Sequence, residues 1–120
     1  MQKLQRILVV EDEFLIALDL QQQLTELGYV CVGPARSLTE AMALAGSSEL
    51  RIDAAVLDLF LDGERVDRLC VLLERKGIPF AFATGANQRA DLGGWPSHPC
   101  IEKPFSPDDV KRLMERLVRK

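Results

Sequence analysis

The sequence contains few of the residues that build disulfide frameworks and zinc sites. Its three cysteines lie far apart and form no CxxC pair, and its single histidine, His98, stands between Ser97 and Pro99 with no ligand-like spacing. An odd number of isolated cysteines predicts neither a disulfide framework nor a zinc site. We therefore expect reduced thiols, a cytoplasmic location and a surface position for His98.

Long apolar segments and an excess of basic residues are also missing. The first apolar run, residues 7–10, is followed at once by the acids of residues 11–13. Four residues are far fewer than the roughly 20 that span a membrane, and too few for a secretory signal. The net charge of −3 gives no electrostatic reason to expect nucleic acid, whose binding depends on many Lys and Arg side chains. We expect neither a membrane nor a nucleic acid as a partner.

The composition, with 120 residues of which 48% are hydrophobic and 28% charged, predicts one globular domain over residues 1–120. Short β-branched or apolar runs alternate with segments of helical periodicity. We expect strands at residues 7–10, 29–32, 53–57, 79–83 and 100–102. Helices are expected from residue 14 to a stop at Gly28, from 38 to 45, from 66 to 73 and from 107 onward.

Two features refine this pattern of helices. The sequence Ser106-Pro107-Asp108-Asp109 combines an N-cap residue, a first-turn proline and first-turn acids, which is typical of a helix start. The Gly- and Pro-rich residues 85–99 leave room only for a short or irregular helix around residues 87–92.

Alternating strands and helices joined by short loops predict the α/β class. The strands are then parallel, the crossovers are right-handed, and helices cover both faces of the sheet. In such sheets ligands bind at the carboxyl ends of the strands. This rule identifies the sheet edge at which to look for a site.

Polar residues follow four of the five expected strands at that edge: Glu11 and Asp12, Asp58, Thr84, and Lys103. Carboxylates about 4 Å apart repel by roughly 4 kcal/mol per pair at an effective dielectric near 20. A cation relieves this repulsion, and oxygen ligands favour Mg²⁺. Beside it, Asp58 is suited to act as a nucleophile toward phosphorus, with Lys103 stabilising charge and Thr84 donating a hydrogen bond.

Four motifs in order resemble the receiver domain of bacterial two-component response regulators, and the match covers essentially the whole chain. They are VVEDE at 9–13, VLDLFLDG at 56–63, FATG at 82–85 and EKPF at 102–105. The resemblance implies a doubly wound, five-stranded parallel sheet of the flavodoxin-like (βα)5 type with strand order 2-1-3-4-5. The segment PFAFATG at 79–85 also resembles a subgroup of single-domain regulators that lack a DNA-binding output and often work with variant histidine kinases.

The resemblance implies a phosphoacceptor and a metal site. Asp58 would be phosphorylated by a histidine kinase or a histidine phosphotransfer protein, and the phosphorylated chain would act on a downstream protein target. Mg²⁺ would be bound by Asp12, Asp58 and the backbone carbonyl of Phe60, with Glu11 acting through water.

Further roles follow from the same resemblance. Lys103 would pair with the phosphoryl group, the bond to Pro104 would be cis, and Thr84 would move toward the phosphate. The receiver would also catalyse its own slow dephosphorylation. Phe60 and Ala86 would flank the route of the attacking water and tune the lifetime of the phosphate.

Two departures from the family pattern concern the response to phosphorylation. Cys100 occupies the position where the family usually carries a switching Tyr or Phe, so the usual aromatic rotation is excluded. The shortened segment of residues 85–99 alters a face through which many receivers pair or contact their outputs. We therefore expect a monomer or a weak dimer.

Other interpretations remain open from the residues alone. The acids of residues 11–13 also suit a helix start, Asp58 also suits a turn, and Thr84 also suits a strand end. A degenerate receiver that docks without phosphorylation is the main alternative. A haloacid-dehalogenase-like phosphatase expects an acid where this chain has Phe60, and an FMN binder expects a phosphate-cradling loop where residues 11–13 are acidic.

Overall fold

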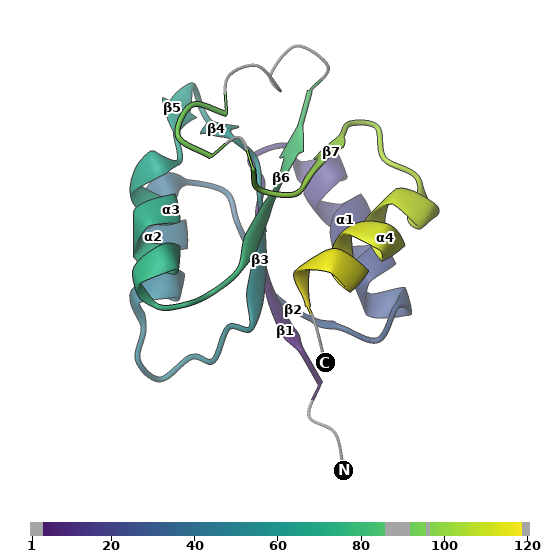
Figure 1. Ribbon diagram of the computed structural model, residues 1–120, viewed down its shortest axis with the longest axis horizontal. Helices are drawn as coiled ribbons and strands as arrows, with labels where there is room; N and C mark the ends of the chain where they lie inside the picture. The colour runs from purple at the N-terminus through teal and green to yellow at the C-terminus, as the bar shows by residue number, and fades with distance from the viewer. Residues whose placement is uncertain (1–3, 86–91, 96, 119–120) are drawn as a thin grey trace.

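A computed structural model describes residues 4–85, 92–95 and 97–118 of the chain (Figure 1). Its main sheet has five parallel strands in the order β2-β1-β3-β6-β7. These strands are β1 Arg6–Val10, β2 Val30–Ala35, β3 Ala54–Leu57, β6 Phe80–Thr84 and β7 Cys100–Glu102. With the short hairpin of β4 and β5 set aside, the order is 2-1-3-4-5, so the predicted α/β fold and strand order are confirmed.

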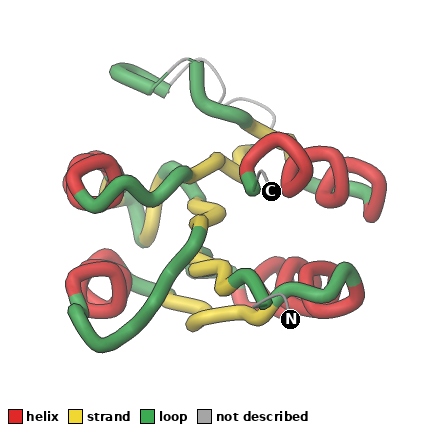
Figure 2. The backbone as a smooth tube through the Cα atoms, turned by 60° about the horizontal axis from the view of Figure 1, so that its bottom comes forward, coloured by secondary structure: helices red, strands yellow, loops and turns green. Residues whose placement is uncertain are grey.

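Four helices cover the two faces of this sheet. They are α1 Phe14–Glu26, α2 Leu38–Gly46, α3 Asp67–Arg75 and α4 Pro107–Leu117. Helices α2 and α3 lie on one face, and α1 and α4 lie on the other, so the strands run between two pairs of helices (Figures 1 and 2). None of the helices described is long and apolar enough to cross a bilayer.

The apolar runs of the strands supply two separate cores because successive side chains of a strand point to opposite faces. In β1, Leu8 and Val10 belong to the core beneath α2 and α3, whereas Ile7 and Val9 belong to the core beneath α1 and α4. All four side chains are at most 1% exposed. Burial on both faces explains why a continuous apolar run, rather than an alternating one, forms this strand.

Helix α4 begins as its sequence predicts. The Ser106 hydroxyl accepts a hydrogen bond from the Asp109 amide at 3.1 Å, and the Asp109 carboxylate accepts one from the Ser106 amide at 2.9 Å. This reciprocal capping box satisfies two backbone donors that the helix leaves unpaired. By contrast, Glu13 occupies the N-cap of α1 without a side-chain capping bond.

Strand β2 runs three residues beyond its predicted end at residue 32, and Gly33 allows it to do so. Gly33 has φ +95°, and an added Cβ would lie 2.6 Å from the Ala35 nitrogen and 3.0 Å from the Val9 oxygen. The register between β1 and β2 shifts at this point, and the Ala35 carbonyl then accepts a hydrogen bond from the Glu11 amide at 2.9 Å. The irregular end of β2 therefore anchors the first acidic residue of the expected site.

Strands β4 (Phe60–Leu61) and β5 (Glu64–Arg65) form a short antiparallel hairpin that the sequence pattern did not predict. Asp62 and Gly63 form the turn at its tip, and both residues have positive φ, 50° and 79°. Positive φ at both central residues is typical of two-residue hairpin turns.

The predicted short helix around residues 87–92 falls mainly outside the described residues, since 86–91 are not described. Leu92 lies in a loop, and the described part of the segment between β6 and β7 contains no helix.

Candidate functional site

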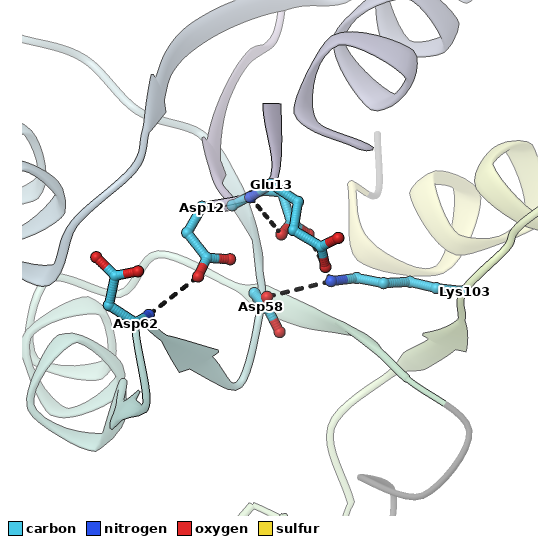
Figure 3. Close-up of polar contacts among 6 residues, drawn as sticks. Asp12, Glu13, Asp58, Asp62 and Lys103 are labelled. Carbon is cyan, nitrogen blue, oxygen red and sulfur yellow. Dashed lines mark hydrogen bonds and ion pairs between the residues drawn. The ribbon is translucent and has the colours of Figure 1, made fainter. Parts of the chain in front are cut away.

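The carboxyl ends of β1, β3 and β6 lie side by side because the register of the sheet aligns them. Val10 pairs with Leu57, and Leu57 pairs with Phe82 in the next strand. The residues that follow, Glu11 and Asp58, therefore emerge at one edge of the sheet. Lys103 follows β7 and reaches the same edge (Figure 3).

Lys103 joins two buried carboxylates at this edge. Its Nζ lies 2.6 Å from Glu11 Oε1 and 3.1 Å from Asp58 Oδ2. The Lys103 amide also donates to the Thr84 carbonyl at 2.7 Å, which ties the lysine to the end of β6. The Glu11 and Asp58 side chains are 2% and 7% exposed, so this one cation serves both carboxylates away from water.

Burial dominates the electrostatics of this pair of carboxylates. It raises the pKa of Glu11 to about 7, with the hydrogen bond from Lys103 opposing the rise and the charge of Asp58 adding to it. Burial alone would lower the pKa of Lys103, but the bonds and charges of Glu11 and Asp58 outweigh it, so its pKa is raised. A single lysine therefore stays charged yet does not fully compensate the negative charge gathered here.

Asp12 is held from a different direction, by the hairpin that follows Asp58. Its Oδ2 accepts a hydrogen bond from the Asp62 amide at 3.0 Å (Figure 3). Burial acts to raise the Asp12 pKa, but the Asp62 bond and a hydrogen bond with Glu11 outweigh it, so the pKa lies below its usual value. Asp12 is therefore an ionised carboxylate at neutral pH, and the backbone amide of Asp62 orients it.

The arrangement offers oxygen atoms to a cation. The carboxylates of Glu11, Asp12 and Glu13 have oxygens within 4.8 Å of one another. Asp58 Oδ1 is buried and has no hydrogen-bond partner among the described residues, although the other oxygen of the same carboxylate is bound by Lys103. A buried carboxylate oxygen without a partner is costly, and a hard divalent ion would satisfy it. The donor set and this oxygen fit Mg²⁺.

Comparisons with known proteins find relatives over most of the chain, although no family model matches it. The regulator PhyR of Methylorubrum extorquens is 35% identical over 115 residues, which cover 93% of this chain and 43% of that protein. The solution structure of SdrG from Sphingomonas melonis Fr1 has a TM-score of 0.84 and 36% identity, and the match covers 95% of this chain and 96% of that one. The response regulator PhyR from Brucella abortus has a TM-score of 0.80 and 33% identity over 97% of this chain and 48% of that chain.

The chain belongs to the response-regulator receiver domains. Its family gives it a role in two-component signalling. The receiver spans less than half the length of the curated relative that it matches.

The receiver's predicted switch threonine lies inside the protein. Thr84 is fully buried at the end of β6, and its Oγ1 lies 3.4 Å from Cys100 Sγ on the neighbouring strand β7. Cys100, which occupies the position expected for a switch aromatic, is therefore in direct contact with the threonine hydroxyl.

Three further residues were predicted to belong to the site: Pro104, Phe60 and Ala86. The Lys103–Pro104 peptide bond is cis. Phe60 is half-buried in β4, with the Arg65 guanidinium 5.4 Å from the centre of its ring. Ala86 lies outside the described residues.

The receiver contains two features of the site that the sequence reasoning did not identify. One is Glu13, whose carboxylate joins the acidic group beside Glu11 and Asp12. The other is the Asp62 amide, which orients Asp12. The Asp62-Gly63 turn signal, placed a few residues after Asp58, was the available clue to the second.

An aromatic cluster occupies the described part of the segment between β6 and β7. The Trp95 indole donates to Asp67 Oδ1 at 2.9 Å, and Asp67 is also held by Arg65 at 2.6 Å. His98 stacks on Phe80 with ring centres 4.3 Å apart. His98 is thus partly buried, so the expected surface position holds only in part, because Phe80 offers an apolar face to its ring.

Proposed function

We propose that this receiver is a phosphorylation-dependent switch in which Asp58 accepts a phosphoryl group from a histidine kinase or a histidine phosphotransfer protein. The observation that supports the proposal most directly is the state of the Asp58 carboxylate. One oxygen is paired with Lys103, whereas the other is buried and finds no hydrogen-bond partner in the part of the chain that the structure describes. A bound cation or a phosphoryl group would supply the partner that this oxygen lacks among the described residues.

The proposed reaction is a transfer between two side chains. An Asp58 oxygen attacks the phosphorus of a phosphohistidine and forms an acyl phosphate. The phosphorus–nitrogen bond breaks, and its electron pair returns to the imidazole nitrogen, which takes up a proton. Lys103 lies 3.1 Å from the acceptor carboxylate and supports the charge on the transferred group.

The metal is part of this proposal. Asp12, Asp58 and the backbone carbonyl of Phe60 would hold Mg²⁺, with Glu11 acting through water. When bound, Mg²⁺ supplies charge neutralisation at the phosphoryl oxygens. The Asp62 amide keeps the Asp12 carboxylate in place for this role.

The proposed output is a change in affinity for a downstream protein. Phosphorylation replaces the carboxylate charge of about −1 at Asp58 with an acyl phosphate charge of about −1.5 to −2, beside Lys103 and near the end of β6. Thr84 then donates its hydroxyl to the phosphoryl group. The cytoplasm suits this role, since the described residues include three unpaired cysteines.

A degenerate receiver that docks without phosphorylation is the second candidate. The presence of Cys100 at the position of the switch aromatic favours it. Under this alternative, the partner binds equally well whether or not Asp58 is modified.

Acetyl phosphate with Mg²⁺ tests the proposal, with intact mass as the measurement. The native protein should gain the mass of one phosphoryl group, and Asp58→Asn should gain none. The exposed acid Asp108 supplies a matched control, since Asp108→Asn should be modified like the native protein. No modification of the native protein, or an adduct that survives Asp58→Asn, would contradict the switch.

Magnesium titration followed by Trp95 fluorescence tests the metal site. Asp12→Ala should weaken binding strongly, whereas Asp108→Asn should not. An unchanged affinity in Asp12→Ala would remove Asp12 from the proposed ligands.

A further inference from the structure

The contact between Thr84 and Cys100 joins the last two strands of the sheet. Phe82 pairs with Cys100 and Thr84 pairs with Glu102, so β7 runs directly beside the end of β6. Thr84 is fully buried, Cys100 is half-buried, and the hydroxyl oxygen lies 3.4 Å from the sulfur.

The backbone of Thr84 has little freedom to move. Its carbonyl accepts the Lys103 amide at 2.7 Å, and the side chain of Lys103 is itself held by Glu11 and Asp58. A change at Asp58 therefore reaches Thr84 most easily through rotation of its side chain. For a β-branched side chain such a rotation moves between a few discrete positions.

The thiol is a weak partner for a buried hydroxyl. Buried hydroxyls need a hydrogen-bond partner, but sulfur donates and accepts only weakly. A phosphoryl oxygen is a charged acceptor, and hydrogen bonds to charged acceptors are roughly twice as strong as neutral ones. An exchange of partners from sulfur to phosphoryl oxygen is therefore favourable.

We propose that Cys100 is a positioning residue for Thr84, which holds the threonine hydroxyl weakly in the unmodified protein and releases it to a phosphoryl group on Asp58. This inference rests on the proposed function. In it, one weak hydrogen bond takes the place of the missing aromatic rotation. The strength of the partner at position 100 then sets how readily Thr84 responds.

Titration with fluoroberyllate and Mg²⁺, a mimic of the phosphoryl group, distinguishes this role from simple packing. Cys100→Ser gives the hydroxyl a stronger partner before modification, so affinity for the mimic should fall about two- to tenfold. Cys100→Ala removes the partner, so affinity should rise by about the same factor. Shifts in the same direction, or no shift in either variant, would overturn the proposal.

Cys31 supplies a matched control. It is another half-buried thiol with a weak contact, to the Gln21 carbonyl at 3.6 Å, and it lies on β2. Cys31→Ser should leave the affinity unchanged. An effect equal to that of Cys100→Ser would also count against the proposal.

The Thr84→Val background removes the hydroxyl while keeping the shape of the side chain. There, the Cys100 substitutions should no longer shift the affinity for fluoroberyllate. Persistent shifts would assign Cys100 a packing role and overturn the inference.

Urea unfolding of the same variants without fluoroberyllate gives an independent answer if the Thr84→Val protein does not bind the mimic. Cys100→Ala should lower the folding equilibrium constant about fivefold more with Thr84 present than in the Thr84→Val background. Equal losses of the folding equilibrium constant in the two backgrounds would show that the contact between Cys100 and the Thr84 hydroxyl is unimportant, and would overturn the proposal. Failure of the native protein to bind fluoroberyllate with Mg²⁺ would instead count against the proposed function itself.

Discussion

Neutralisation of Glu11 should make the protein more stable at neutral pH when Mg²⁺ is absent. Folding raises the pKa of this carboxyl from 4.5 to about 7 because the side chain is buried. A group with a raised pKa binds its proton more tightly in the folded state, so its contribution is favourable below the unfolded pKa and is lost as the pH rises through the folded pKa. At about 1.4 kcal/mol for each pKa unit, the loss between pH 4.5 and 7 is about 3 kcal/mol.

Urea unfolding at pH 5 and pH 7.5 in the presence of a chelator measures this loss. The native protein should lose about 2 kcal/mol of unfolding free energy over this range relative to Glu11→Gln, because glutamine does not titrate. Glu49→Gln is the control, since this exposed side chain lies far from the site in sequence and should leave the pH profile unchanged. Added Mg²⁺ should restore stability to the native protein at pH 7.5, because a ligand that binds only the folded state stabilises it.

Two results would refute this reasoning. Identical pH profiles for the native protein and Glu11→Gln would mean that burial does not govern the Glu11 carboxyl. A loss of stability that grows as the pH falls from 7.5 to 5 would have the opposite sign to the one derived from its raised pKa.

Three further substitutions test the elements that build the site. Lys103→Met removes the cation shared by two buried carboxylates and should cost about 3–5 kcal/mol in urea unfolding without Mg²⁺; a loss below 1 kcal/mol would show that the pairing is unimportant. Gly33→Ala should cost about 1–3 kcal/mol more than Gly28→Ala, since both glycines have φ +95° but only Gly33 has backbone atoms within 4 Å of an added Cβ; equal losses would contradict the close approach. Asp67→Asn weakens the partner of the Trp95 indole and should change its fluorescence, and an unchanged spectrum would argue against that bond.

The order of strands and helices was predictable because it depends on local periodicity. The apolar run before Asp58 and the helix start at Ser106, with its N-cap residue and first-turn proline, are signals that neighbouring residues carry by themselves. Parallel strands then bring their carboxyl ends to one edge, which is why Glu11, Asp58 and Lys103 were correctly expected to meet.

The extension of β2 to Ala35 was not predictable from local pattern. It depends on the approach of Gly33 to the Val9 carbonyl in a different strand. The bond from Trp95 to Asp67 likewise joins residues 28 positions apart. Interactions of this kind are decided when distant segments pack, and no periodicity encodes them.

The sequence alone determined which residue types form the site. It places acidic residues, Thr84 and Lys103 at the ends of strands. Only the tertiary structure decided how they interact, since burial sets the pKa of Glu11 and the pairing of β6 with β7 brings Cys100 against Thr84. The physical reason is that solvent exclusion and strand register are properties of the packed chain. The departure at Cys100 was visible in the sequence, but its contact with the threonine hydroxyl required the neighbouring strand.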